Sequence, residues 1–132
     1  MEVLILLNLN NMKIPFINEE FLISKYDIWE KSANPNWRGG DRYILFMEGK
    51  KYRSSLGDLL IDSNEKYTYT ITIVGERGIQ CHFNFIEDNF VGEIHFSDKN
   101  YDTINCFKDG QAIFPFETLE DYRDRRIEKL IK

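Results

Sequence analysis

Between residues 66 and 107 the chain alternates apolar and polar side chains along three successive segments. The apolar positions are Tyr67, Tyr69, Ile71 and Ile73, then Ile79, Cys81, Phe83 and Phe85, then Phe90, Ile94 and Phe96. Alternation with period two puts one face of a β-strand in the core and the other in water. Residues typical of turns separate the segments at 75–78, 87–89 and 97–100. The pattern predicts an antiparallel sheet in which consecutive strands are neighbours.

Two helices are predicted to flank this sheet. Residues 18–33 begin at Asn18, a suitable N-cap, and carry Leu22, Tyr26 and Trp29 at helical spacing. Residues 119–131 follow Thr118, a second N-cap. Their apolar stripe consists of Leu119, Tyr122, Ile127 and Leu130. A length of 132 residues suits a single core. We therefore expect one α+β domain over residues 1–132, an antiparallel meander of five to seven strands with an N-terminal and a C-terminal helix packed on one face.

Shorter segments complete the expected layout. Residues 3–7 form an apolar run that is too short for a signal peptide or a membrane span, and a first strand is favoured there. Two strands are predicted at 42–47 and 51–54, joined around Gly49. Residues 55–65 are compatible with a helical turn.

The expected register brings two histidines next to carboxylates. Pairing by apolar face sets Thr72 opposite His82, His82 opposite Glu93, and His95 opposite Asp102. A carboxylate beside an imidazole raises its pKa, as acid–base catalysis requires. The same pairs are also expected as polar contacts on a solvated sheet face. The sequence shows neither an activated nucleophile nor the tight His and Cys spacing of zinc sites. We therefore expect no catalytic residue, no metal and no cofactor.

Acidic residues concentrate between Cys81 and Asp121. Nine Asp or Glu and two Lys give this stretch a balance of −7, against −5 for the whole chain. Clustered carboxylates attract a cationic partner, although the stretch is also compatible with an ordinary solvated surface. The candidate partner-binding residues are Glu87, Asp88, Glu93, Asp98, Asp102 and Asp109, with Trp37 and Arg38 on a loop at 34–40. Trp and Arg are included because they dominate binding hot spots.

Charge and cysteine content exclude several classes. A net charge of −5 argues against binding nucleic acid or an anionic membrane surface, because both need basic residues. The two cysteines, Cys81 and Cys106, are too few for a disulfide framework and fall on opposite faces of the expected sheet. We expect both to be reduced thiols in a cytoplasmic protein.

The chain resembles bacterial toxin-immunity proteins in its size, acidity, aromatic content and lack of a catalytic motif. These proteins are small cytosolic inhibitors that often bind a nuclease toxin and block its active site. The resemblance implies a non-enzymatic protein whose partner is a basic toxin domain. One alternative is a small-molecule-binding protein or acid–base enzyme that uses His82 with Glu93 and His95 with Asp102. Another is an oligomer-forming subunit, such as a homodimer, in which a β edge or the basic C-terminal helix docks on the acidic region of a second copy.

Overall fold

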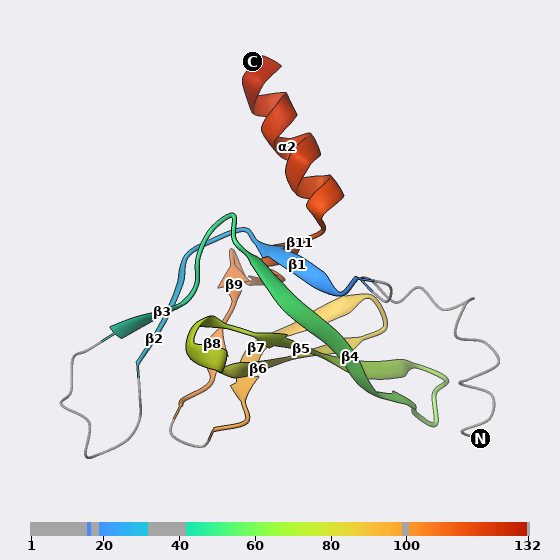
Figure 1. Ribbon diagram of the computed structural model, residues 1–132. Coiled ribbons are helices and arrows are strands. Elements are labelled where there is room, and N and C mark those ends of the chain that lie inside the picture. The colour runs from blue at the N-terminus through green and yellow to red at the C-terminus, as the bar shows by residue number, and fades with distance from the viewer. Residues whose placement is uncertain (1–15, 17–18, 32–41, 99–100, 132) are drawn as a thin grey trace.

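The computed structural model describes residues 16, 19–31, 42–98 and 101–131. The strands are β1 (Phe21–Ser24), β2 (Ile28–Lys31), β3 (Arg42–Phe46), β4 (Lys51–Ile61), β5 (Tyr67–Val74), β6 (Gln80–Ile86), β7 (Asn89–Phe96), β8 (Ile104–Asn105), β9 (Phe107–Lys108), β10 (Gln111–Ala112) and β11 (Phe116–Glu117). The helical elements are the short 3-10 turn η2 (Glu76–Gly78) and the helix α2 (Leu119–Ile131). Seven strands form one antiparallel sheet in the order β11-β1-β4-β5-β6-β7-β8 (Figure 1). The pairs β2–β3 and β9–β10 form two small sheets.

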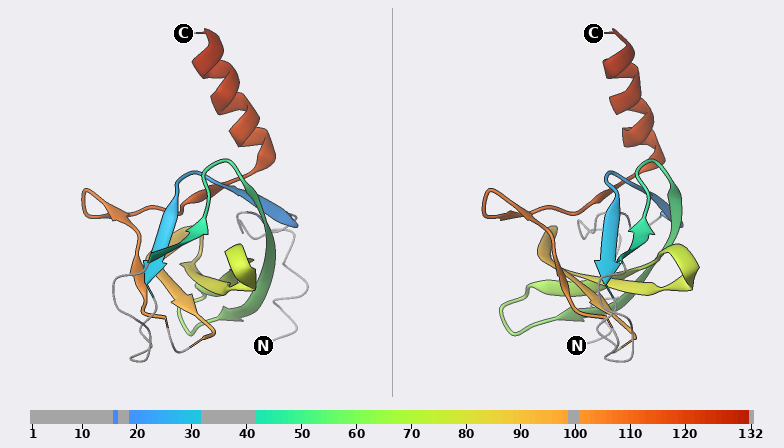
Figure 2. Two further views of the ribbon diagram at one scale, coloured as in Figure 1. Left: turned by 60° about the vertical axis from the view of Figure 1, so that its left-hand side comes forward. Right: turned by 90° about the vertical axis from the view of Figure 1, so that its left-hand side faces the viewer.

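The long sheet curls around one hydrophobic core (Figure 2). Its fully or nearly fully buried side chains include Leu22, Leu45, Phe46, Tyr69, Ile71, Ile73, Cys81, Phe83, Phe85, Ile94 and Phe116. The members from β5, β6 and β7 are those that the alternating pattern assigned to the buried face. The predicted antiparallel sheet is confirmed, and its seven strands lie at the upper end of the expected number.

The predicted register is confirmed between β5 and β6 and changes within β7. Ile71 faces Phe83, and Phe85 faces Phe90, as expected. Beyond a bulge, however, Phe83 faces Ile94. The bulge contains Gly92, whose φ of +109° lies in a region that only glycine adopts readily. The shift preserves which face is buried, because it displaces the pairing by an even number of residues.

The predicted N-terminal helix at 18–33 is wrong for the described residues 19–31. They form β1 and β2, joined by a bend at Lys25 and Tyr26. β1 is held between β4 and β11, where Ile23 faces Glu117 and Lys51. These neighbours satisfy the backbone of β1 across the sheet, and such tertiary pairing outweighs a helical spacing of apolar residues. The helical turn considered for 55–65 is also absent, because β4 continues to Ile61.

The C-terminal helix is confirmed, but its predicted packing on the sheet is wrong. The backbone N–H of Asp121 donates to Thr118 Oγ1 at 3.1 Å, so Thr118 caps α2 as expected. The helix then leaves the sheet and projects away from it (Figures 1 and 2). Ile127 and Leu130 remain 53% and 86% exposed. The segment from Phe114 to Phe116 takes the place in the core that the helix was expected to occupy.

Replacing Gly92 by Ala should destabilise the protein. A Cβ at this position would clash with the ring of Phe107, and the positive φ would strain any L side chain. We expect the free energy of unfolding in urea to fall by about 2 kcal/mol, mainly from backbone strain. Gly57 is the matched control, because a Cβ there meets no atom within 4 Å. Gly57→Ala should change stability by less than about 1 kcal/mol, and equal losses in the two variants would contradict the role of Gly92.

Candidate functional site

A cleft lined by exposed aromatic side chains lies between β2 and the β8–β9 segment. Its volume is about 420 Å³, within the range typical of binding pockets. Tyr26 and Trp29 line one side, and Phe107 lines the other. These side chains are 49%, 46% and 53% exposed. We call this feature the aromatic cleft and define it by Tyr26, Trp29 and Phe107.

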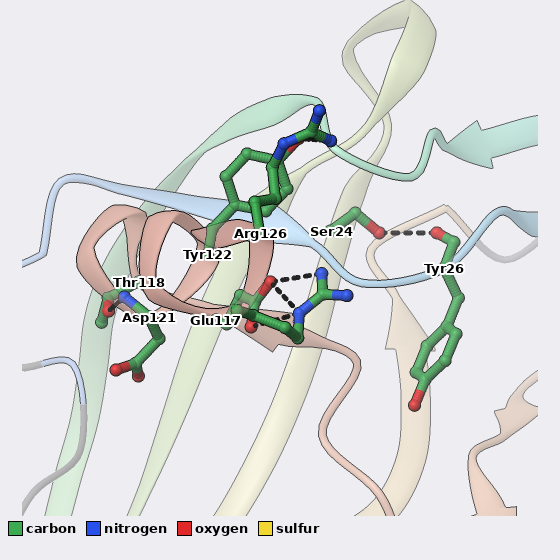
Figure 3. Close-up of polar contacts among 8 residues, drawn as sticks. Ser24, Tyr26, Glu117, Thr118, Asp121, Tyr122 and Arg126 are labelled. Atoms are coloured by element: carbon green, nitrogen blue, oxygen red, sulfur yellow. Dashed lines mark hydrogen bonds and ion pairs between the residues drawn. The ribbon is translucent and has the colours of Figure 1, made fainter. Parts of the chain in front are cut away.

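Local structure explains why these rings face water. In β2 the alternation of a strand buries Glu30 and turns the neighbouring Trp29 outward. Tyr26 lies in the bend after β1, where its carbonyl accepts a hydrogen bond from Ser24 Oγ at 2.7 Å (Figure 3). Phe107 lies over Gly92, which leaves room for the ring only because it has no Cβ. Trp29 and Tyr26 were predicted to belong to the buried stripe of a helix, so sequence reasoning missed them as site residues.

The lining of the aromatic cleft contains one acidic and one basic side chain, and two further carboxylates adjoin it in the sequence. Asp27 lines the cleft, and its Oδ1 accepts a hydrogen bond from the exposed Glu48 backbone N–H at 2.8 Å. Lys108 also lines the cleft, and Asp109 follows it in the tight β9–β10 turn. Asp102 precedes the cleft-lining β8 by two residues. Asp27 and Lys108 balance one another in the lining, so attraction of a cationic group comes from Asp102, Asp109 and the net charge of −5.

The predicted acidic binding residues do not gather on one surface. Glu87 and Asp88 form the turn between β6 and β7, whereas Asp98 follows the opposite end of β7. An eight-residue strand separates these ends by roughly 23 Å. Glu93 lies within β7 opposite Asn105. Asp102 and Asp109 adjoin the aromatic cleft in sequence, while the predicted Trp37 and Arg38 lie outside the described residues.

One acidic residue of the stretch from Cys81 to Asp121 forms an ion pair within the chain. Glu117 is buried, and its carboxylate accepts hydrogen bonds from Arg125 Nη2 at 2.7 Å and Nε at 3.1 Å (Figure 3). Two parallel donors make this pair geometrically specific. Within the described part of the chain, Glu87, Asp88, Asp102 and Asp109 form no ion pair. These four carboxylates are open to a partner.

Neither predicted histidine–carboxylate pair forms among the described residues. The bulge at Gly92 shifts the register, so His82 faces His95 instead of Glu93. The two ring nitrogens of His82 contact hydroxyls, Thr72 Oγ1 at 2.9 Å from Nδ1 and Ser97 Oγ at 2.6 Å from Nε2. The β7–β8 pairing also differs by one residue from the one expected, because Ile94 faces Ile104. That difference takes Asp102 out of the register position opposite His95.

A buried charge lies where the β2–β3 pair meets the turn after β5. Glu30 is 4% exposed, and its Oε1 accepts a hydrogen bond from Arg77 Nη2 at 3.4 Å. The Arg77 guanidinium also stacks on the Tyr43 ring at 3.9 Å. Burial raises the pKa of the Glu30 carboxyl, although Arg77 opposes that shift. Glu30 Oε2 has no hydrogen-bond partner among the described residues, so this carboxylate is incompletely compensated.

The two cysteines form no disulfide bond, and their burial makes both thiols poor nucleophiles. Burial raises the pKa of the Cys81 thiol to about 12 and that of the Cys106 thiol to about 11. Only the thiolate is a nucleophile or a good metal ligand, and both thiols are protonated near neutral pH. Neither cysteine therefore supplies the chemistry of a catalytic site.

No protein-family model, no curated protein and no solved structure matches this chain. Among the side chains that the structure describes, no group of three or more His, Cys, Asp or Glu could hold a metal ion. Over the same residues, no helix has both the length and the apolar character needed to cross a membrane. The function is therefore inferred from the contacts, exposure and charge of the chain's own residues.

Two glutamates should give opposite dependences of stability on pH. The pKa of Glu30 is raised above 4.5, so its contribution to stability is full below that value and is lost as the pH rises. Hydrogen bonds from Lys50 and Tyr52 lower the pKa of Glu76, so its contribution is present above 4.5 and is lost as the pH falls. Urea unfolding of Glu30→Gln and Glu76→Gln at several pH values, each compared with the wild type, measures the two contributions to stability.

As the pH rises above 4.5, we expect the stability difference from the wild type to shift in favour of Glu30→Gln, and as the pH falls below 4.5 we expect it to shift in favour of Glu76→Gln. Each variant serves as the control for the other, because both replace a carboxylate by an amide. Parallel pH profiles for the two variants would contradict the assignment of Glu30 as the incompletely compensated charge.

Proposed function

We propose that this protein binds a basic protein partner and does so without catalysis. The observation that supports this proposal is the gathering of Tyr26, Trp29 and Phe107, all exposed, around one cleft. Tyr, Trp and Phe are enriched at protein interfaces, and Trp and Tyr carry much of their binding energy. Scattered exposed apolar side chains are common, whereas several at one cleft are typical of an interaction site.

Charge defines the class of partner. The aromatic cleft has Asp27 and Lys108 in its wall, and Asp102 and Asp109 adjoin it in the sequence. The net charge of the chain is −5, so the long-range field attracts basic proteins and repels acidic ones. A basic toxin domain is the partner that agrees with the resemblance of the sequence to immunity proteins. In this proposal the aromatic cleft anchors the toxin, and Asp102, Asp109 and the negative net charge speed its association.

The decisive experiment uses the protein encoded by the adjacent gene as the candidate toxin. Calorimetry and stopped-flow mixing give its affinity and association rate, and an assay of its activity tests neutralisation. We expect Trp29→Ala to weaken binding by about 30-fold or more, as for a hot-spot residue. We expect Asp102→Lys combined with Asp109→Lys to slow association about tenfold at low salt.

Glu65→Lys combined with Glu128→Lys is the matched control for the charge effect. Both double variants change the charge equally, and each alters one turn residue with positive φ, Asp109 or Glu65. Glu65 and Glu128 are exposed and do not line the aromatic cleft, so association should remain close to the wild-type rate. Equal slowing by the two pairs, or full affinity in Trp29→Ala, would contradict the proposed site.

A second candidate function rests on the contacts of His82. If Nδ1–H donates to Thr72, Nε2 is left to accept the Ser97 hydroxyl proton, an arrangement that can activate serine as a nucleophile. Ser97 also lines a cavity of about 490 Å³ with Arg77 and Gln80. An ester hydrolase of this kind would transfer the Ser97 proton to His82 as Oγ attacks the carbonyl carbon.

A fluorophosphonate probe distinguishes the two functions. The hydrolase requires covalent labelling of Ser97 that is lost in His82→Ala and reduced in Thr72→Val. A non-enzymatic binding protein should stay unlabelled at probe concentrations that saturate a control serine hydrolase. Mass spectrometry of the intact chain reads the result directly.

A further inference from the structure

In the described part of the chain, β2 and β3 form a sheet of their own to one side of the long sheet (Figure 1). An isolated two-stranded pair is marginally stable in water, so this pair depends on its attachments to the rest of the molecule. One end is attached by apolar burial, because Leu45 and Phe46 at the end of β3 lie fully inside the core. The opposite end carries Glu30 and Tyr43, which face each other across the pair. We call this end the distal end.

Arg77 in the turn η2 holds the distal end by contacts that are weak for a buried charge. Its Nη2 donates to Glu30 Oε1 at 3.4 Å, beyond the usual range of about 2.7–3.2 Å. Its guanidinium stacks on the Tyr43 ring at 3.9 Å. Glu30 Oε2 is buried without a hydrogen-bond partner among the described residues. Arg77 also has a φ of +61°, so the residue that holds the distal end is itself strained.

The other groups around Glu30 add no positive charge. Asp98, two residues after β7, raises the pKa of the Glu30 carboxyl beyond the larger effect of burial, and Arg77 opposes both. Tyr101 before β8 and Cys81 on β6 also lie within reach of this carboxylate. Burial, and after it the charge of Glu30, raises the pKa of both groups, so they are uncharged near neutral pH. Arg77 is therefore the one cation among these described neighbours.

We propose that the distal end is a gate, which swings away from η2 when Glu30 is ionised and stays closed when Glu30 is protonated. Opening returns a carboxylate to water, whereas a protonated carboxyl gains much less from hydration. The pKa of Glu30 is raised in the closed state and ordinary in an open, hydrated one. Opening therefore becomes more favourable as the pH rises above 4.5. Leu45 and Phe46 stay in the core and act as the hinge.

The gate controls the aromatic cleft because Trp29 precedes Glu30 in β2. The Trp29 side chain lines the cleft, while Glu30 is buried on the opposite face of the same strand. Movement of the distal end displaces Trp29 relative to Phe107 on the other side of the cleft. A partner that is anchored by Trp29 therefore binds the closed gate. The gate itself is independent of the proposed function, whereas its effect on the partner rests on that function.

Native-state hydrogen exchange followed by mass spectrometry tests the gate between pH 5 and pH 8. Peptides from β2 and β3 should exchange at least about tenfold faster than those from β5 and β6, because the gate opens without the core. After correction for the intrinsic pH dependence of exchange, the opening constant of β2 and β3 should rise with pH by up to about tenfold per unit. The rise should end once the carboxyl of the closed state is also ionised.

Glu30→Gln keeps the shape of the side chain and removes its charge. In this variant β2 and β3 should open less than in the wild type at neutral pH, and the rise with pH should disappear. Glu65→Gln is the matched control, because it makes the same change at an exposed position in the turn between β4 and β5. It should exchange like the wild type. A wild-type opening constant that ignores pH overturns the gate, as does an unchanged profile in Glu30→Gln or equal protection of β2 and β5.

The candidate toxin separates failure of the gate from failure of the proposed function. A partner that binds the closed gate stabilises it, so toxin at ten times its Kd should slow the exchange of β2 and β3 about tenfold at neutral pH. The predicted pH profile without toxin binding would support the gate and contradict the proposed function. Toxin binding with exchange that is independent of pH would contradict the gate alone.

Discussion

The fold depends on one cluster of aromatic rings that joins strands far apart in the sequence. Phe83 on β6 meets Phe114 and Phe116 edge to face, with ring centroids 5.5 and 5.3 Å apart. Phe46 on β3 meets Phe116 in the same manner at 4.8 Å. Edge-to-face pairs add to the energy of apolar burial and also fix orientation. The cluster ties the β2–β3 pair to the sheet and thereby places Trp29 at the aromatic cleft. It also ties β11 to the sheet and thereby fixes where α2 begins.

The sequence predicted those parts of the fold that local patterns control. Alternation along β5, β6 and β7 marks their buried faces, and Thr118 marks the start of α2. The prediction of a helix at 18–33 was wrong because Leu22, Tyr26 and Trp29 fit a helical period. The strands that pair with β1, which are β4 and β11, lie elsewhere in the chain. Non-local pairing of this kind leaves no local signal that is stronger than the helical spacing.

The candidate site was less predictable, for two physical reasons. Acidic residues are abundant between Cys81 and Asp121, but β7 separates Asp88 from Asp98, which lie beyond its two ends. The aromatic cleft combines Trp29 with Phe107, residues that no local pattern connects. One signal was available, because a glycine inside a strand often marks a bulge. Gly92 would have warned that His82 need not face Glu93.

The aromatic cleft lies where the curled sheet fails to close. Among the described residues, β8 ends the seven-stranded sheet, and β2 pairs only with β3. A long unpaired edge would invite open-ended association with other chains, but β8 has two residues and β2 has four. Short edges offer few backbone groups for pairing, so recognition at this opening has to come from side chains. The exposed rings of Trp29 and Phe107 can supply that recognition through their area and shape.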